Sequence, residues 1–443
     1  MSTLDRTALA ELLRGVDEVE CVTPDLNGVP RGKVMTAEGF LEGRRLQLAR
    51  GVLLQCIMGG YPAPCYYGSD DGDLALNAEP TQIHRLPWSE TPRALAICDA
   101  DELDGRSSGL STRGLLKQVI ARYASHGWQP VVATELEFFV FARNADPLQP
   151  FQPPLGLDGR REDGGSAFGV SSNNGLRPFF REVYQCMAAL GLPRDTFMHE
   201  MGVSQFEINL LHGDPLLLAD QTFLFKHLLK EVALKHGLTV VCMAKPLAHT
   251  PGSSMHIHQS VVEQGSGRNI FSAEKGEATA AFHHFIGGQQ AAMADFTLLF
   301  APHVNSYQRL CHPYASPNNA CWSLDNRAAG LRIPASLPTA RRRRSRPASH
   351  SRPGRATPRW RATASRTWFS SASGFSPGRT TLATCKPPPR SERRSTIRWK
   401  VPCAKGQQST DGWARTCSRP HRQSTLRPRR VRTCGTETGG LGW

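Results

Sequence analysis

Apolar residues recur at helical spacing in some segments and at every second position in others, which predicts a fold that mixes helices with strands. Helical spacing predicts helices over residues 7–13, 114–126, 179–190 and 222–236. Alternation and short apolar runs predict strands over residues 19–22, 33–35, 93–98, 131–141, 205–211 and 254–261. Turn-forming residues at 25–28 separate the first two strands, and the Gly/Pro-rich stretch 146–174 is expected to be a loop.

The spacing of these elements predicts an α+β protein with two folded domains. The short strands before Asp104 indicate a small N-terminal domain over residues 1–104. Longer helices and strands then indicate a second domain over residues 105–336, and the chain shows no internal repeat.

The pattern ends abruptly after Ser336. A run of four arginines, Arg341–Arg344, opens a segment of Arg, Pro, Ser and Thr with no helical or strand period, so residues 337–443 are treated as a separate tail. Aliphatic residues nearly vanish there, and such a segment cannot offset its chain entropy by burial. We therefore expect a disordered or non-native basic tail.

The net charge of +15 is a property of that tail alone. Residues 337–443 hold 25 basic residues against three acidic ones, so the tail is near +22 and the preceding part near −7. An acidic body is typical of a soluble cytoplasmic enzyme. A basic tail can attract nucleic acid or acidic membranes, but no aromatic platform accompanies it, so we do not expect a nucleic-acid partner.

The cysteines and the N-terminus also favour a cytoplasmic protein without a membrane segment. No CxxC or zinc-ribbon spacing is present, and Cys56, Cys98, Cys186 and Cys242 lie in apolar runs typical of buried, reduced thiols. Residues 1–14 have no apolar signal region, and no stretch approaches the ~20 apolar residues of a membrane helix.

Acidic residues lie two apart in the predicted strands. Glu135 and Glu137 share one strand face while Leu136 and Phe138 face the core, and Glu207 shares its face with Gln205 and Asn209. In a third predicted strand, His256, His258 and Ser260 also share one face. Glu200 lies just before the predicted strand that carries Glu207. Gathered carboxylates repel one another unless cations hold them, and oxygen-rich sites with an imidazole suit Mg²⁺ or Mn²⁺. The alternative is that each is an ordinary solvated strand face.

A cationic cluster follows, with Arg309, Arg327 and Arg332 within 24 residues. Arginine binds carboxylates and phosphates bidentately. Alone, these are more often surface arginines; beside a carboxylate–metal site they are candidates for clamping a transferring phosphoryl group.

Together these motifs resemble the glutamine synthetase family, from about Val16 to Ala335. The matching stretches are Glu135-Leu-Glu-Phe-Phe, Gln205-Phe-Glu-Ile-Asn, Lys245-Pro246, Gly252-Ser-Ser-Met-His-Ile-His-Gln-Ser, Asn305-Ser-Tyr-Gln-Arg and Asn326-Arg-Ala-Ala-Gly-Leu-Arg-Ile-Pro. The resemblance implies an N-terminal β-grasp domain, a catalytic domain built on an antiparallel sheet with flanking helices, and a homo-oligomer, a dodecamer with sites between subunits.

The resemblance also implies chemistry and roles. In the family, ATP phosphorylates the side-chain carboxylate of glutamate, an amine displaces phosphate, and two or three Mg²⁺ or Mn²⁺ ions hold the phosphates. The positions that match are Glu137, Glu200 and Glu207 for one metal, Glu135 and His256 for the other, His258, Ser260 and Arg332 for the nucleotide, Arg309 and Gly252 for glutamate, and Arg327 and Asp73 for catalysis.

Two departures bear on the amine. Ammonia-using members carry a Glu where this chain has Ala315, and an Asn where it has Pro251. Residues 206–215 and 251–255 look like the γ-glutamylpolyamine synthetase branch, whose acceptor is an organic amine such as putrescine. We therefore favour a glutamate–amine ligase; an ordinary glutamine synthetase and a non-catalytic member of the family are the alternatives.

A third departure concerns the end of the family's domain. After Ile333-Pro-Ala-Ser336 the family continues with an Arg–Glu–Arg segment and a helical region, and neither is recognisable here. An Arg/Pro/Ser-rich sequence is what a GC-rich gene gives when it is read out of frame. We therefore expect impaired activity in this exact chain, or a broken gene product; an evolved basic extension is the alternative.

Overall fold

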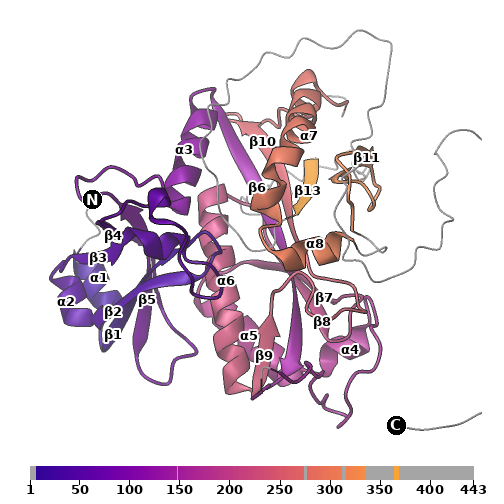
Figure 1. Ribbon diagram of the computed structural model, residues 1–443, viewed down its shortest axis with the longest axis horizontal. Coiled ribbons are helices and arrows are strands. Elements are labelled where there is room, and N and C mark those ends of the chain that lie inside the picture. The colour runs from indigo at the N-terminus through magenta and orange to yellow at the C-terminus, as the bar shows by residue number, and fades with distance from the viewer. Residues whose placement is uncertain (1–5, 147, 274–276, 312–315, 335–363, 369–443) are drawn as a thin grey trace, which may run out of the picture. The chain divides into compact units, whose positions relative to one another are not determined.

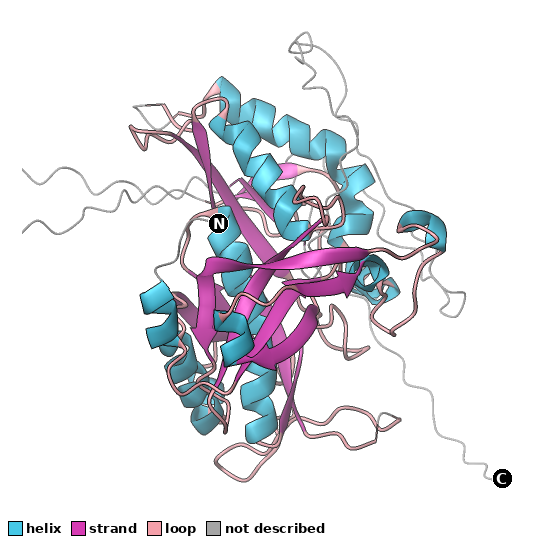
Figure 2. Cartoon of the chain, turned by 90° about the vertical axis from the view of Figure 1, so that its left-hand side faces the viewer, coloured by secondary structure: helices cyan, strands magenta, loops and turns pink. Residues whose placement is uncertain are grey.

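The computed structural model describes residues 6–146, 148–273, 277–311, 316–334 and 364–368 (Figure 1). These residues form two β-sheets with flanking helices and a short two-stranded sheet. Figure 2 shows the strands gathered together with helices along their flanks. The mixed helix and strand content predicted from the sequence is confirmed.

The N-terminal sheet contains five strands among the described residues, in the order β2-β1-β5-β4-β3. β1 and β5 are parallel, and the other neighbours are antiparallel. A hydrophobic cluster of its own, including Val19, Leu48, Leu74 and Ala96, covers one face. The elements are α1 Arg6–Leu12, β1 Glu18–Pro24, β2 Pro30–Thr36, α2 Ala37–Leu41, β3 Leu46–Ala49, η1 Arg50–Leu54, η2 Pro64–Tyr66, β4 Asp73–Arg85 and β5 Arg93–Asp101.

The turn between β1 and β2 is built on a buried carboxylate. Asp25 accepts the backbone N–H groups of Asn27 and Val29 at 2.7 and 2.9 Å and pairs with Arg31 at 2.9 Å. Gly28 has a φ of 67°, a conformation that favours glycine. The sequence prediction of a turn at residues 25–28 is therefore confirmed.

The second sheet runs β13-β10-β6-β8-β7, with β9 also paired to β6, and its neighbours are antiparallel. β6 is its longest strand and lies between β10 and β8. The elements up to β10 are α3 Thr112–Ala124, β6 Trp128–Ala142, α4 Val170–Asn174, α5 Arg177–Ala189, β7 Arg194–His199, β8 Gln205–Leu210, α6 Pro215–Lys235, β9 Leu238–Val241 and β10 Met255–Glu263.

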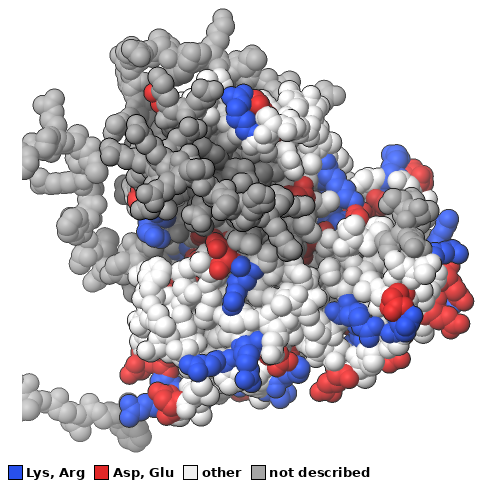
Figure 3. Space-filling model, turned by 180° about the vertical axis from the view of Figure 1, so that it is seen from behind, with Lys and Arg blue, Asp and Glu red and all other residues white. Residues whose placement is uncertain are grey.

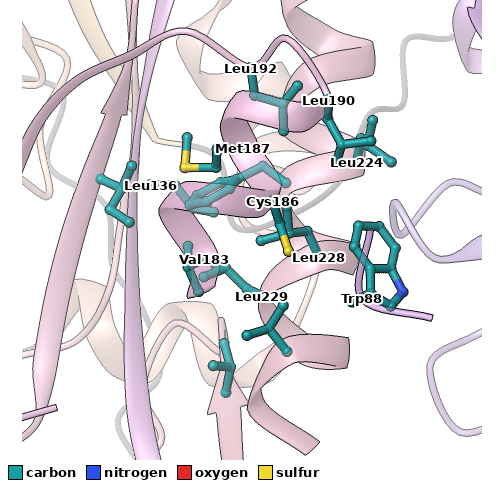
Figure 4. Packing of buried hydrophobic residues seen from close by; sticks show 14 of the residues in the cluster. Trp88, Leu136, Val183, Cys186, Met187, Leu190, Leu192, Leu224, Leu228 and Leu229 are labelled. Carbon is teal, nitrogen blue, oxygen red and sulfur yellow. The ribbon is translucent and has the colours of Figure 1, made fainter. Parts of the chain in front are cut away.

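Helices α5 and α6 cover the apolar face of this sheet. Phe138 and Phe206 of the sheet belong to one hydrophobic cluster with residues of both helices. Figure 4 shows Leu136 of the sheet beside Val183 and Met187 of α5 and the leucines of α6. The cluster also includes Val22, Leu95 and Ile97 of the N-terminal sheet, so α6 lies between the two sheets (Figure 1). The residues of the two expected domains thus share part of one core.

A buried ion-pair network also joins β5 of the N-terminal sheet to helices α3 and α6. Arg113 of α3 donates to both carboxylate oxygens of Asp220 in α6 at 2.8 Å, and it pairs with Asp99 of β5. Both Arg113 and Asp220 are almost completely buried. The hydrogen bonds and charge of Asp220 raise the pKa of Arg113 against the effect of its burial, so the guanidinium stays charged.

The remaining described elements follow β10 in the chain. The long helix α7, Ala280–Phe300, buries only Phe282 and Ile286, which join a small cluster with Val261, Phe271, Leu331 and Ile333. The others are α8 Val304–Leu310, β11 Trp322–Leu324 and β12 Leu331–Ile333.

Several expectations from the sequence need correction. Helix α6 begins at Pro215 rather than Thr222, because the Asp214 side chain caps the N–H groups of Leu216 and Leu217. The loop expected at 146–174 ends in the short helix α4. Cys56 is exposed rather than buried, because it lies in a surface turn closed by its N–H bond to the Gly60 carbonyl.

One strand lies in the tail, where the sequence predicts none. Ala364–Trp368 forms β13 and pairs antiparallel with β10, with Trp368 opposite His256 in register. The outer edge of β10 offers backbone N–H and C=O groups, and any extended segment can satisfy them without a particular side chain. The rest of the tail lies outside the described residues.

Acidic and basic groups intermingle on the described surface. Figure 3 shows Lys and Arg beside Asp and Glu on the visible face, without a large field of one sign. Ion pairs such as Arg93–Glu18 and Lys235–Glu182 account for part of this mixture. Among the helices that the structure describes, none is long and apolar enough to cross a membrane.

Candidate active site

Strand register brings the acidic residues together. Glu135 lies opposite His256 on one side and Asn209 on the other, and Glu137 lies opposite Glu207. Residues directly opposite each other in an antiparallel pair point to the same face. The three strands β10, β6 and β8 therefore present one continuous polar patch, which we call the carboxylate cluster (Glu135, Glu137, Glu207 and His256).

This polar face is buried, unlike an ordinary solvated strand face. Glu137, Glu207 and His256 are only 8%, 5% and 5% exposed. Leu136 and Phe138 lie on the opposite face in the hydrophobic core, as the alternation predicts. The interpretation of these positions as solvated strand faces is therefore wrong for Glu137, Glu207 and His256.

Each histidine on this face contacts a carboxylate. Glu137 accepts the backbone N–H of Ser254 at 2.9 Å and the Ser254 hydroxyl, and its carboxylate lies 3.5 Å from His256 Nε2. Glu135 lies 2.6 Å from His258 Nε2. The histidine expected to share a metal with Glu135 thus contacts Glu137, while the histidine expected at the nucleotide contacts Glu135.

The charges of the cluster are strongly coupled. Burial, followed by the charges of Glu137, Glu135 and Glu200, raises the pKa of Glu207 to about 9. Burial alone would also raise the pKa of Glu137, but the hydrogen bond and charge of His256, with the charge of Arg309, hold it below its ordinary value. The two facing carboxyl groups therefore shift in opposite directions: His256 and Arg309 favour the charged form of Glu137, whereas burial and the neighbouring carboxylates favour the neutral form of Glu207.

Glu200 stands at the end of β7, next to this face. Its N–H donates to the Gln205 carbonyl at 2.8 Å, and the Gln205 side chain donates to Glu137 at 3.3 Å and to the Gly252 carbonyl at 3.2 Å. Gln205 therefore connects the Glu200 turn, the cluster and the segment before β10.

Arg309 approaches the same face from α8 and is almost completely buried. A Cβ on Gly252 would lie 2.8 Å from Arg309 Cγ and 2.1 Å from the Ala244 carbonyl, so the close approach requires glycine. The Asn305 side chain accepts the N–H of Lys245 at 2.6 Å and donates to its carbonyl at 2.7 Å, which fixes α8 against this segment.

Other expected residues lie apart from the cluster in the contacts that the structure describes. Arg327 is exposed, and Arg332 pairs with Asp325 rather than with a carboxylate of the cluster. Ser260 accepts a hydrogen bond from Asn269 at 2.8 Å, and Asp73 is exposed at the start of β4. Ala315 lies outside the described residues.

A divalent cation fits the donor set, although the side chains are not yet arranged around one. In the described part of the chain, no three His, Cys, Asp or Glu side chains form a ready-made ligand group. The carboxylates turn instead to Ser254 and His258. A hard cation among them would oppose the burial and the carboxylate repulsion that together raise the pKa of Glu207, and carboxylates with an imidazole are suitable ligands.

Several residues of this site were not predicted from the sequence. Ser254 lies two residues before His256, so the period of two contains a signal for it. The bridging role of Gln205 and the Asn305–Lys245 contact depend on side chains meeting across distant segments. Sequence spacing contains no signal for those contacts.

Known proteins share this architecture. Residues 109–351 match the family described as glutamine synthetase, catalytic domain. A structure of GmaS in complex with ADP superposes with a TM-score of 0.62 at 25% identity, covering 74% of both chains.

Three curated relatives match over 71–72% of this chain. They are a glutamine synthetase of Pyrococcus abyssi (32% identical, 67% of the relative), a gamma-glutamylethanolamide synthetase of Streptomyces coelicolor (31%, 69%) and a gamma-glutamylputrescine synthetase of Escherichia coli (29%, 68%). Ligases of this family use ATP and divalent metal ions. The buried carboxylates in register, the fold and these matches lead to one conclusion: the chain belongs to the glutamine synthetase family.

Proposed function

We propose that this protein is an ATP-dependent ligase that joins the side-chain carboxylate of glutamate to an organic amine through a γ-glutamyl phosphate. The observation that carries the proposal is the carboxylate cluster, in which Glu137 faces Glu207 inside the protein. Burying carboxylates together is costly without a cation. These buried carboxylates do not stabilise the fold, so we explain their presence by a function in binding metal ions and phosphate.

The residues of the cluster have separate tasks in this proposal. Glu137, Glu200 and Glu207 would hold one divalent ion, and Glu135 with His256 the other. Bound ions would neutralise the nucleotide phosphates and the charge that develops on the transferring phosphoryl group. Ser254 fixes the Glu137 carboxylate through two hydrogen bonds, and His258 orients Glu135.

Arg309 and Gly252 would bind glutamate. A buried guanidinium beside a glycine gives a substrate carboxylate room to form paired hydrogen bonds. Arg327 would stabilise the transferring phosphoryl group, and Asp73 would contribute to the amine site. His258, Ser260 and Arg332 would contact ATP. These roles require Arg332 to leave Asp325 when nucleotide binds.

An organic amine is the favoured acceptor. Pro251 and Ala315 replace an amide and a carboxylate expected in an ammonia-using site, and two relatives have names that specify ethanolamide or putrescine products. The test is an ATP-dependent coupling assay with ammonium, ethanolamine and putrescine, with the γ-glutamyl product measured by mass spectrometry. We expect amide formation with an organic amine to exceed glutamine formation; a preference for ammonium would contradict this.

Ordinary glutamine synthesis is the second candidate. The Pyrococcus relative, a glutamine synthetase, is 32% identical to this chain. The same amine panel separates the two functions, because each substrate gives a product of different mass. Glu207→Gln should abolish product formation with every amine, and a retained activity would exclude the cluster as the catalytic site.

Oligomeric state and domain boundaries belong to the same proposal. We expect a β-grasp domain over residues 1–104, a catalytic domain over residues 105–336 and a cytoplasmic homo-oligomer, a dodecamer. Light scattering coupled to size-exclusion chromatography measures the mass directly. A monomer would show that the expected sites between subunits do not form in this chain.

We further propose that residues 337–443 are read out of frame and that this chain has impaired activity. The chain follows the family pattern to Ser336, and the tail then stands where the Arg–Glu–Arg segment is expected. Resequencing the gene across the codons for Ile333 to Arg344 tests this. A gained or lost base that restores that segment supports the proposal, and an unchanged sequence with an active product contradicts it.

A further inference from the structure

The segment 162–168 of the long loop lies directly against the turn that carries Glu200. The Glu162 carboxylate accepts the Ser204 N–H at 2.6 Å, and its two oxygens lie 2.9 and 3.1 Å from His199 Nε2. His199 is completely buried and lies 37 residues from Glu162 in the chain. One carboxylate thus contacts both ends of the turn 200–203.

The backbone of the same segment adds two contacts. The Phe168 N–H donates to the His199 carbonyl at 2.9 Å. A Cβ on Gly165 would lie 1.8 Å from the Met201 carbonyl oxygen, so only glycine permits this approach. We call residues 162–168 the strap, because these contacts hold the turn from outside.

The His199 ring connects the strap to Glu200 itself. Its Nδ1 lies 2.7 Å from the Glu200 carbonyl oxygen, while Nε2 faces Glu162. Ser204, at the far end of the turn, has a φ of 54°, which an L-residue rarely adopts without support. The Glu162 contact to the Ser204 N–H supplies support at that strained position.

We propose that Glu162 is a positioning residue for the Glu200 carboxylate and that the strap thereby sets the affinity of the carboxylate cluster for a divalent cation. The inference rests on the proposed function, in which Glu200 is a metal ligand. Glu200 is also held from the other side, where its N–H donates to Gln205 of β8. Release of the strap would leave the contacts to β8 in place but remove the support on the other side of the turn, and the direction of the Glu200 side chain would become less fixed.

The test measures Mn²⁺ binding to the full chain by electron paramagnetic resonance, with no activity required. Glu162→Ala removes both contacts, whereas Glu162→Gln keeps an acceptor for the Ser204 N–H and loses the charge that faces His199. Asp163→Asn is the matched control, because it neutralises the neighbouring exposed carboxylate. Loss of a group that orients a metal ligand weakens metal binding about 10–100-fold, so we expect a loss of about 10-fold or more in Glu162→Ala.

Two outcomes follow for variants that keep the circular dichroism of the parent chain. A loss in Glu162→Ala, a smaller loss in Glu162→Gln and unchanged binding in Asp163→Asn support the proposal. Equal Mn²⁺ affinity in the parent chain and Glu162→Ala overturns it.

Failure of the proposed metal site is distinguishable from failure of the strap. If the parent chain binds no Mn²⁺, the metal site is excluded for this chain, and amide hydrogen exchange decides about the strap. Faster exchange at Ser204 and Phe168 in Glu162→Ala than in Asp163→Asn retains Glu162 as the residue that holds the turn. Equal exchange rates at both amides overturn the inference.

Discussion

Helices α6 and α7 are each 21 residues long, but their surroundings differ. α6 contains five charged residues and buries eleven side chains between the two sheets. α7 contains a single charged residue, Asp295, and yet buries only Phe282 and Ile286 among its described neighbours. Leu298, near its C-terminal end, is 70% exposed.

The difference shows that apolar content alone does not determine burial. Soluble helices normally have a polar face toward solvent, and a helix apolar on most sides is usually covered on most sides. α7 has the apolar composition of a buried helix, but among the described residues few side chains pack against it. This agrees with the proposal that the tail replaces a region that belongs to the domain.

The largest expected effect is in the core of α6. Phe225→Ala should reduce the free energy of unfolding by about 3–5 kcal/mol, because a completely buried ring leaves a cavity. Its matched control is Phe285→Ala in α7, where we expect only about 1–2 kcal/mol for a half-buried ring. Urea unfolding measures both, and equal losses would mean that α7 is covered as fully as α6.

A loss of stability of nearly the same size is expected when the buried ion pair between Arg113 and Asp220 of α6 is broken. Arg113→Met leaves the buried Asp220 carboxylate without its bidentate partner and should cost about 3–5 kcal/mol. Lys117→Met is the control, because Lys117 binds Asp99 from a more exposed position and should contribute about 0–1 kcal/mol. Similar losses of stability in the two variants would show that the buried pair of Arg113 and Asp220 does not stabilise the contact between β5 and the helices α3 and α6.

Replacement of Lys226 in α6 is expected to increase the free energy of unfolding, by a smaller amount than the losses above. Burial, with the charge of Lys230, lowers the pKa of Lys226 although the neighbouring Cys242 opposes the shift. A lowered folded pKa means that stability falls as the pH drops through the unfolded value of about 10.4. Lys226→Met should therefore raise stability at pH 7 by up to about 1 kcal/mol.

The pH dependence provides the check on Lys226. Unfolding curves at pH 7 and pH 10.5 should show the advantage of Lys226→Met decreasing at the higher pH. Lys230→Met, at an exposed position of the same helix, should change stability by less than about 0.5 kcal/mol at both values. An advantage of Lys226→Met that is independent of pH would exclude the charge as its cause.

The smallest effect on stability is expected on the exposed side of α7. Leu298→Glu should change the free energy of unfolding by less than about 0.5 kcal/mol, because Leu298 contributes little burial. The same change should reduce the binding of an apolar fluorescent dye, since it interrupts an exposed apolar surface. A large loss of stability would show that residues outside the described part cover Leu298.

Sequence periodicity predicted the elements with a clean alternation or helical stripe. The polar face of β6 was predicted because Glu135 and Glu137 alternate with core residues, but its register against Glu207 is known only from the structure. β4 was missed because Pro80 interrupts it and its pairing with β5 shifts between Ala78 and Ile83. α7 was missed because its apolar residues do not form a stripe.

The candidate site was predicted less completely than its strands. Period two identifies which residues share a face, but it does not reveal which side chains meet across the sheet. His256 contacts Glu137 although its register partner is Glu135. Glu162 could not be predicted, because a carboxylate in a Gly-rich loop has no local pattern that indicates its contact with His199.

The parallel pairing of β1 with β5 determines when during synthesis the N-terminal sheet can form. β1 ends at Pro24, but its central partner begins only at Arg93, so the sheet waits until β5 has left the ribosome. The codons from 337 onward follow roughly 10–50 s later at ordinary translation rates. A reading-frame error at that point would therefore arise in a chain whose N-terminal sheet has already had time to form.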